Sequence, residues 1–236
     1  MALSTEHKAT PYVVIDFETG GLDLKTNALT EIACIAIKGD TLEEIDRYEA
    51  LIAPYGYKYD QRAFEVTGLS LEKLQEEGKP IKDVMDDFIA FLQKANVHKS
   101  KTGYKPMIVA HNPLFEVNCL QHLFHVTGKT ALMPNLLHGS FDFHGNYQPY
   151  YQDTITLAKL IWAANKRMKN YKLGDVCGMM GLEIVDAHRA MNDVKPTLEF
   201  LSNSIQLLRG GNGISASSDT GIKNSREGFH FQIPKA

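Results

Sequence analysis

Two carboxylates, Asp16 and Glu18, stand two residues apart in a run of β-branched and aromatic residues, PYVVIDFE. Side chains two residues apart on a strand point to the same face of the sheet. Like charges side by side in a buried strand destabilise the fold unless a cation neutralises them. Hard carboxylate oxygens suit Mg²⁺ or Mn²⁺. The pair therefore indicates a divalent-metal site, and two ordinary acids at a solvent-exposed strand end are the alternative.

Three further residues extend this chemistry. Glu116 falls in the first turn of a helix expected after Asn112, its N-cap, where an acid also complements the helix dipole without any catalytic role. His188 and Asp193 would be about 140° apart if both lay within one helix, so they would not share a face. They can reach the same site only if His188 lies at the N-terminal end of the helix and Asp193 in its first turns. Carboxylates that hold two metal ions, with a histidine that takes a proton from water, are the parts of a two-metal phosphodiester hydrolase.

The elements that must position these residues follow from apolar periodicity and turn residues. We expect strands at 11–18, 29–38, 47–53 and 107–110, and helices after Ser70 and at 81–92, 113–126, 154–164, 172–180 and about 187–208. Strands first, followed by alternating strand and helix, predict an α/β layered domain with a mixed sheet.

The 236 residues suit one domain, and a composition with 44% hydrophobic and 22% charged residues excludes a disordered or fibrous chain. We expect an N-terminal extension at 1–10, a folded domain at 11–208 and a flexible Gly/Ser-rich tail at 209–236. No signal peptide or apolar membrane span is visible, so we expect a cytoplasmic protein. The cysteines, which match no zinc spacing, are expected to be buried and reduced: Cys34, Cys119 and Cys177.

Three segments resemble, in order, the motifs of the DEDDh 3′→5′ exonucleases, the DnaQ-like group that includes the proofreading subunit of bacterial replicative polymerases and ribonuclease T. They are DFETG at 16–20, VAHNPLFE at 109–116 and HRAMND at 188–193, with weaker echoes at 66–70, 153–154 and 172–175. The resemblance covers roughly residues 11–208 and implies a ribonuclease H-like fold. This fold is a mixed five-stranded sheet whose first three strands are antiparallel, flanked by helices.

The resemblance also implies roles for single residues. Asp16, Glu18 and Asp193 would hold the tighter of two Mg²⁺ (or Mn²⁺) ions, and Asp16 would bridge to the second. His188 would be the general base for the attacking water. The product would be a nucleoside 5′-monophosphate released from a 3′ end.

Glu116 departs from the pattern, because the second motif of the family normally ends in Asp. The extra methylene moves the carboxylate by about 1.5 Å, one bond length. We expect Glu116 to bind the second metal and the activity to be retained. The charge is preserved, and the other four residues match the family pattern: Asp16, Glu18, His188 and Asp193. The alternative is a catalytically weakened nuclease-like module that binds a 3′ end or a polymerase partner.

The resemblance implies that the residues directly after the first acidic motif bind the terminal nucleotide. Aromatic rings nearby could stack on bases. The residues expected to contact substrate are Thr19, Gly20, Gly21, Leu22, Phe64, Asn112 and Phe115. For Phe115, a core position on an apolar helix face is the favoured alternative. A basic cluster offers contacts to a phosphate backbone or is simply a solvated face: Lys166, Arg167, Lys169 and Lys172.

The expected substrate is the 3′ end of single-stranded nucleic acid, with DNA favoured over RNA. The net charge of −3 gives no bulk attraction to nucleic acid, so a local patch or metal ions must supply it. The tail at 209–236, which ends in an apolar piece, is a candidate tether for a DNA polymerase or sliding clamp, with a disordered end as the alternative. A homodimer is compatible with the sequence. The loop at 136–152 is expected to shape either a substrate channel or an oligomer contact, and the sequence does not decide between them.

Overall fold

The computed structural model describes residues 10–96, 105–182 and 189–210. The predicted general base, His188, lies outside the described residues. So do residues 1–9 of the expected N-terminal extension and residues 211–236 of the expected tail.

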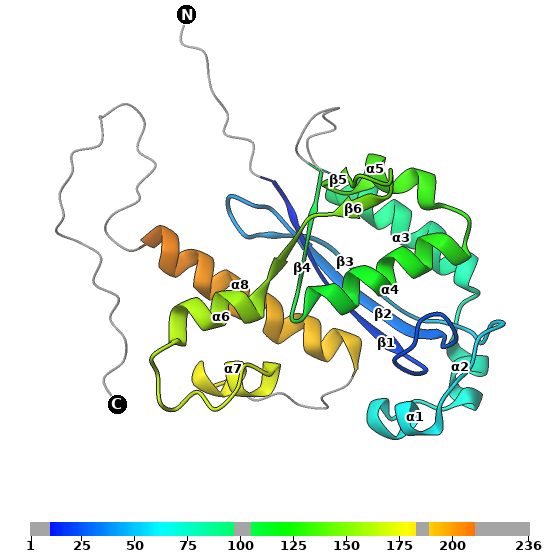
Figure 1. The fold of residues 1–236 in the computed structure, drawn as a ribbon, viewed down its shortest axis with the longest axis horizontal. Coiled ribbons are helices and arrows are strands. Elements are labelled where there is room, and N and C mark those ends of the chain that lie inside the picture. Colours follow the sequence, from blue (N-terminus) through cyan, green and yellow to red (C-terminus); the bar gives the residue numbers. More distant parts are fainter. Residues whose placement is uncertain (1–9, 97–104, 183–188, 211–236) are drawn as a thin grey trace, which may run out of the picture.

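A five-stranded mixed sheet forms the centre of the molecule, with the strand order β3-β2-β1-β4-β7 (Figure 1). Its strands are β1 (Tyr12–Thr19), β2 (Leu29–Ile37), β3 (Glu44–Leu51), β4 (Met107–Ala110) and β7 (Tyr151–Asp153). The first three strands pair antiparallel, β4 pairs parallel with β1, and β7 pairs parallel with β4. This arrangement confirms the predicted sheet.

Helices cover both faces of the sheet (Figure 1). They are α1 (Gln61–Thr67), α2 (Leu71–Glu77), α3 (Ile81–Ala95), α4 (Pro113–Val126), α5 (Met133–Leu136), α6 (Thr154–Trp162), α7 (Leu173–Met179) and α8 (Ala190–Gly210), with a 3₁₀ turn at Thr130–Leu132. The α3 and α4 helices pack on one face, and α8 packs on the other against β1 and β2.

Alternation along β1 decides which face receives the acids. Val13, Ile15 and Phe17 are buried in the core shared with α3 and α4. Val14 packs in the second core, against α8. Because Asp16 and Glu18 follow Val14 at two-residue spacing, their side chains lie on the α8 face of the sheet.

The structure corrects several expected boundaries. The third strand begins at Glu44 rather than at residue 47, since its polar first residues lie on an exposed sheet edge. The α1 helix was not predicted. The α8 helix runs to Gly210, so the first two residues of the expected tail are helical. The three cysteines are free and buried, as predicted.

The expected loop at 136–152 contains regular structure. A hairpin of β5 (Gly139–Phe141) and β6 (Tyr147–Pro149) precedes β7. The Asp142 carboxylate closes the turn by accepting hydrogen bonds from the backbone N–H groups of His144 and Asn146. The hairpin lies at the start of β4, since the His138 N–H donates to the Pro106 carbonyl. Among the described residues no helix is long and apolar enough to cross a membrane.

Candidate active site

Three carboxylates converge where β1 meets the beginning of α8. Asp16 and Glu18 extend from β1, and Asp193 lies in the first turn of α8. One oxygen from each of the three lies within 4.8 Å of the others. The sequence placed these residues in one site from their types and order, and the fold brings them together.

Glu116 is the fourth acid of this region, in the first turn of α4. It is only 4% exposed, and its Oε2 accepts a hydrogen bond of 2.9 Å from the Phe17 N–H. The β4 strand pairs with β1 only as far as Val14, so β1 has no strand partner on that side at Phe17. The carboxylate therefore takes the place of a neighbouring strand, which fixes α4 against β1.

Burial and neighbouring charges raise the pKa of three of these acids, Asp16, Glu18 and Glu116. Burial raises the pKa of Asp16 well above its usual range, and the nearby carboxylates of Glu116, Glu18 and Asp193 raise it further. Burial likewise raises the pKa of Glu116, although the Phe17 hydrogen bond opposes this. The pKa of Glu18 rises to about 8, mainly through burial and then through the charges of Asp193 and Glu31, against the lowering effect of Arg189. Such crowding of acids calls for a compensating cation.

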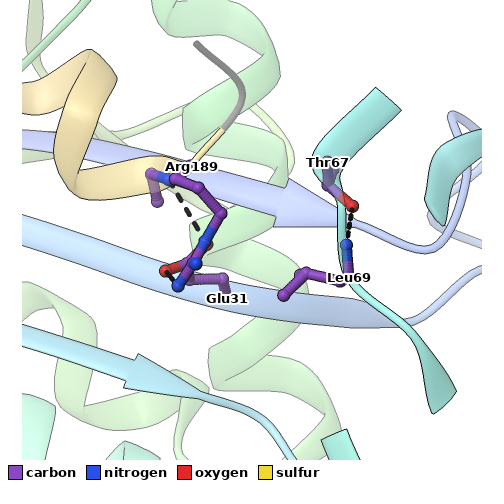
Figure 2. Close-up of polar contacts among 5 residues, drawn as sticks. Glu31, Thr67, Leu69 and Arg189 are labelled. Atoms are coloured by element: carbon purple, nitrogen blue, oxygen red, sulfur yellow. Dashed lines mark hydrogen bonds and ion pairs between the residues drawn. The ribbon is translucent and has the colours of Figure 1, made fainter. Parts of the chain in front are cut away.

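The sequence reasoning missed one acid beside this cluster, Glu31 on β2. It pairs with Glu18 across the antiparallel ladder and forms a bidentate ion pair with Arg189 at the start of α8 (Figure 2). The signal in the sequence was a lone acid within the otherwise uncharged run Leu29–Ile37.

A cavity of about 630 Å³ adjoins Glu18 and lies between the end of β1 and the α1 helix. Four of the residues expected to contact substrate line it, Thr19, Gly21, Leu22 and Phe115. The other lining residues are Phe17, Glu18, Asp23, Asn27, Asp60, Arg62, Ala63, Val66 and Thr67. The Leu22 side chain is 88% exposed, so this cavity has an accessible apolar side chain in its wall.

Three other expected substrate contacts are not among the lining residues. Phe64 stacks its ring on Tyr59, at 5.9 Å between centroids. Asn112 occupies the N-cap position of α4, but it adopts a left-handed conformation (φ 79°) and its side chain makes no capping hydrogen bond, contrary to the expectation. Gly20 is buried. Its N–H donates a hydrogen bond to the Ala28 carbonyl, and its carbonyl accepts one from the Asp60 N–H.

The predicted basic cluster lies in the connection between α6 and α7, where Lys166, Arg167, Lys169 and Lys172 are all exposed. None of the four lines the cavity beside Glu18. The hairpin of β5 and β6 also lies away from the acids, because it joins the start of β4 while the acids lie at the ends of β1 and β4.

The curated proteins whose sequences are similar to this chain include bacterial DNA polymerases. The chain is 28% identical over 199 residues to a PolC-type DNA polymerase III from Thermotoga petrophila and 25% identical over 190 residues to the one from Bacillus subtilis. These matches cover 84% and 80% of this chain but only 12% and 11% of the polymerases. The chain thus spans a small part of the length of these relatives.

Solved structures with the same fold include E. coli exonuclease I. A zinc-bound complex of that protein with single-stranded DNA aligns with a TM-score of 0.65 at 16% identity, covering 86% of this chain and 41% of the other. A complex of it with a dA16 oligonucleotide aligns with a TM-score of 0.63 over 84% of this chain and 41% of the other, also at 16% identity. The likeness confirms the ribonuclease H-like fold. Since the RNase T family model, described as exonuclease, matches residues 13–201, this chain belongs to the DnaQ-like exonuclease family.

Proposed function

We propose that this protein is a metal-dependent 3′→5′ exonuclease of the DEDDh type. Its substrate is the 3′ end of single-stranded nucleic acid, and its products are nucleoside 5′-monophosphates. The observation that carries the proposal is the convergence of Asp16, Glu18 and Asp193 within 4.8 Å beside a cavity of about 630 Å³.

The donor set fits two Mg²⁺ or Mn²⁺ ions. Asp16, Glu18 and Asp193 offer hard carboxylate oxygens, which these cations prefer. Glu116, which accepts the Phe17 N–H at the edge of β1, adds a fourth acid. Burial and mutual repulsion raise the pKa of Asp16, Glu18 and Glu116, so the ionised site is stable only with added positive charge. Cations held by these carboxylates would supply this charge and would polarise the phosphodiester.

The chain's own residues then hold the strand end and move the proton. Leu22 and Phe115, at the cavity wall, provide apolar surface against which a terminal base packs. Thr19 and Gly21 bring the turn after β1 close to the sugar. His188 would accept a proton from the attacking water, a role that suits histidine in general, since a free imidazole titrates near neutral pH.

DNA is the favoured substrate. The E. coli exonuclease I structures contain single-stranded DNA or deoxyadenosine oligonucleotides, and the curated relatives are DNA polymerases. The matching segment of those relatives is part of a polymerase chain, which supports a DNA polymerase as the partner of this protein and a role in DNA replication.

The test uses 5′-labelled single-stranded DNA and RNA of equal sequence, with Mg²⁺, Mn²⁺ or EDTA, and includes D16N as the control for contaminating nuclease. We expect a ladder that shortens from the 3′ end only with metal, faster on DNA and absent with D16N. Equal ladders from D16N would show that the activity comes from another protein. Binding of the oligonucleotide without degradation in either metal would instead support the nuclease-like binding module.

A further inference from the structure

Glu31 is a buried acid to which the proposed chemistry gives no role. It faces Glu18 across the β1–β2 ladder and is only 4% exposed. A lone ionised carboxylate in such a place is costly, and it adds a like charge beside the metal ligands. Its surroundings therefore indicate what it does.

Within the part of the chain that the structure describes, Glu31 accepts its hydrogen bonds from Arg189 and Ala190, at the beginning of α8 (Figure 2). The Arg189 Nε donates to Oε2 at 3.0 Å and its Nη2 donates to Oε1 at 2.9 Å. The Ala190 N–H, at the first residue of α8, donates to Oε2 at 3.3 Å. A planar guanidinium held at two points fixes both distance and orientation, which a single contact does not do.

We infer that Glu31 and Arg189 form a positioning pair that anchors the first turn of α8 to β2 and thereby sets the affinity of the site for divalent cations. Asp193 lies in that same turn, three residues after Ala190. The anchored backbone thus carries a metal ligand toward Asp16 and Glu18. This inference rests on the proposed metal-dependent function.

Charge alone makes a different prediction from positioning. If only the field at the site matters, loss of the Glu31 charge weakens cation binding, and loss of the Arg189 charge strengthens it. If the pair positions α8, both losses weaken binding, because either one releases the first turn. The sign of the Arg189 effect therefore separates the two accounts.

The experiment measures Mn²⁺ affinity of the full chain from the electron paramagnetic resonance signal of free Mn²⁺. The variants are E31Q, R189Q and R189K, with R47Q as the matched control. Arg47 forms an equivalent bidentate pair with Glu44, exposed on β3. We expect binding about tenfold weaker in E31Q and R189Q, as for other residues that support metal ligands. R189K, which keeps the charge but loses the two-point contact, is expected to be intermediate, and R47Q unchanged.

Activity supplies a second readout. The metal concentration for half-maximal nuclease rate is expected to rise in E31Q and R189Q, while the rate at saturating Mn²⁺ largely recovers. Unchanged or tighter Mn²⁺ binding in R189Q would overturn the inference. If R189Q gives no cooperative thermal transition, R189K decides by the same criterion, with unchanged affinity overturning the inference. A wild-type protein that binds no Mn²⁺ would instead refute the proposed function itself.

Discussion

Glu116 shows how one side chain can serve both the fold and the site. Its carboxylate accepts the Phe17 N–H and contributes to the raised pKa of Asp16. The longer side chain at this place in the second motif is therefore compatible with an ordered site. For this reason we retain the proposal of an active enzyme over that of a disabled module.

Two substitutions separate these roles of Glu116. E116Q keeps an oxygen that accepts the Phe17 N–H but removes a charge, so we expect unchanged or higher thermal stability and a nuclease rate lowered by about 100-fold. E116D keeps the charge but shortens the side chain, so the Phe17 hydrogen bond is lost, at a cost of about 1–2 kcal/mol. Thermal melts and initial rates at saturating Mg²⁺ measure both effects. Full activity in E116Q would contradict a metal-binding role for Glu116.

The repulsion at Glu18 predicts a dependence of stability on pH. Its pKa is 4.5 in the unfolded chain and about 8 in the metal-free fold. The folded state therefore binds the proton more tightly, and the free energy of unfolding falls as the pH rises from about 4.5 to 8. Comparison of wild type with E18Q in EDTA isolates this contribution from that of the other acids.

We expect E18Q to gain stability over wild type by about 1–2 kcal/mol at pH 8.5, equivalent to about 3–6 °C in melting temperature, and to lose most of that gain at pH 4.5. Saturating Mg²⁺ should reverse the order at pH 8.5, because only the wild type gains a bound cation. A difference between the two proteins that does not change with pH would contradict the raised pKa.

At the scale of elements, the turn after β1 is fixed by a neighbouring segment. The Asn27 Nδ2 donates to the Gly20 carbonyl and to the Asp60 Oδ2, and the Asp60 N–H donates to the same carbonyl. Gly21 lies against these groups with φ +153°, and a Cβ there would overlap the side chains of Asn27 and Asp60. The turn that lines the cavity is thus tied to the residue that precedes α1.

G21A is expected to displace this turn, because neither neighbour can move without loss of a hydrogen bond. We expect a higher KM for single-stranded DNA and a loss of stability of about 1–3 kcal/mol. G128A is the matched control, since Gly128 also has positive φ (+71°) but has open space at the Cβ and lies after α4. It should lose stability and leave KM unchanged. An equal KM for G21A and wild type would show that this turn does not contact the substrate.

Element by element, the sequence predicts best where the pattern is local. The apolar runs of β1, β2 and β4 and the Ser70 cap of α2, which accepts the Lys73 N–H, follow from short-range signals. The β7 strand has only three residues and no alternation, and it forms because β4 offers a free parallel edge. Glu31 was missed for a similar reason, since its ion pair with Arg189 joins residues 158 positions apart.

In the whole molecule, the two faces of the sheet have different roles. The core with α3 and α4 holds β1 and β2 rigid, and α8 lies across the opposite face with the third carboxylate. The site therefore exists only when α8 is docked, since no local segment contains both β1 acids and Asp193. We therefore expect cation binding and the docking of α8 to be linked.

The number of Mn²⁺ ions bound per chain, measured by equilibrium dialysis at pH 8.5, tests the proposed metal site without any substrate. We expect two ions for the wild type, and weakened or lost binding for D16N. The matched control E44Q, which removes an exposed acid of β3, should still bind two. No bound Mn²⁺ in the wild type, or equal binding by D16N and wild type, would contradict a metal site built from Asp16, Glu18 and Asp193.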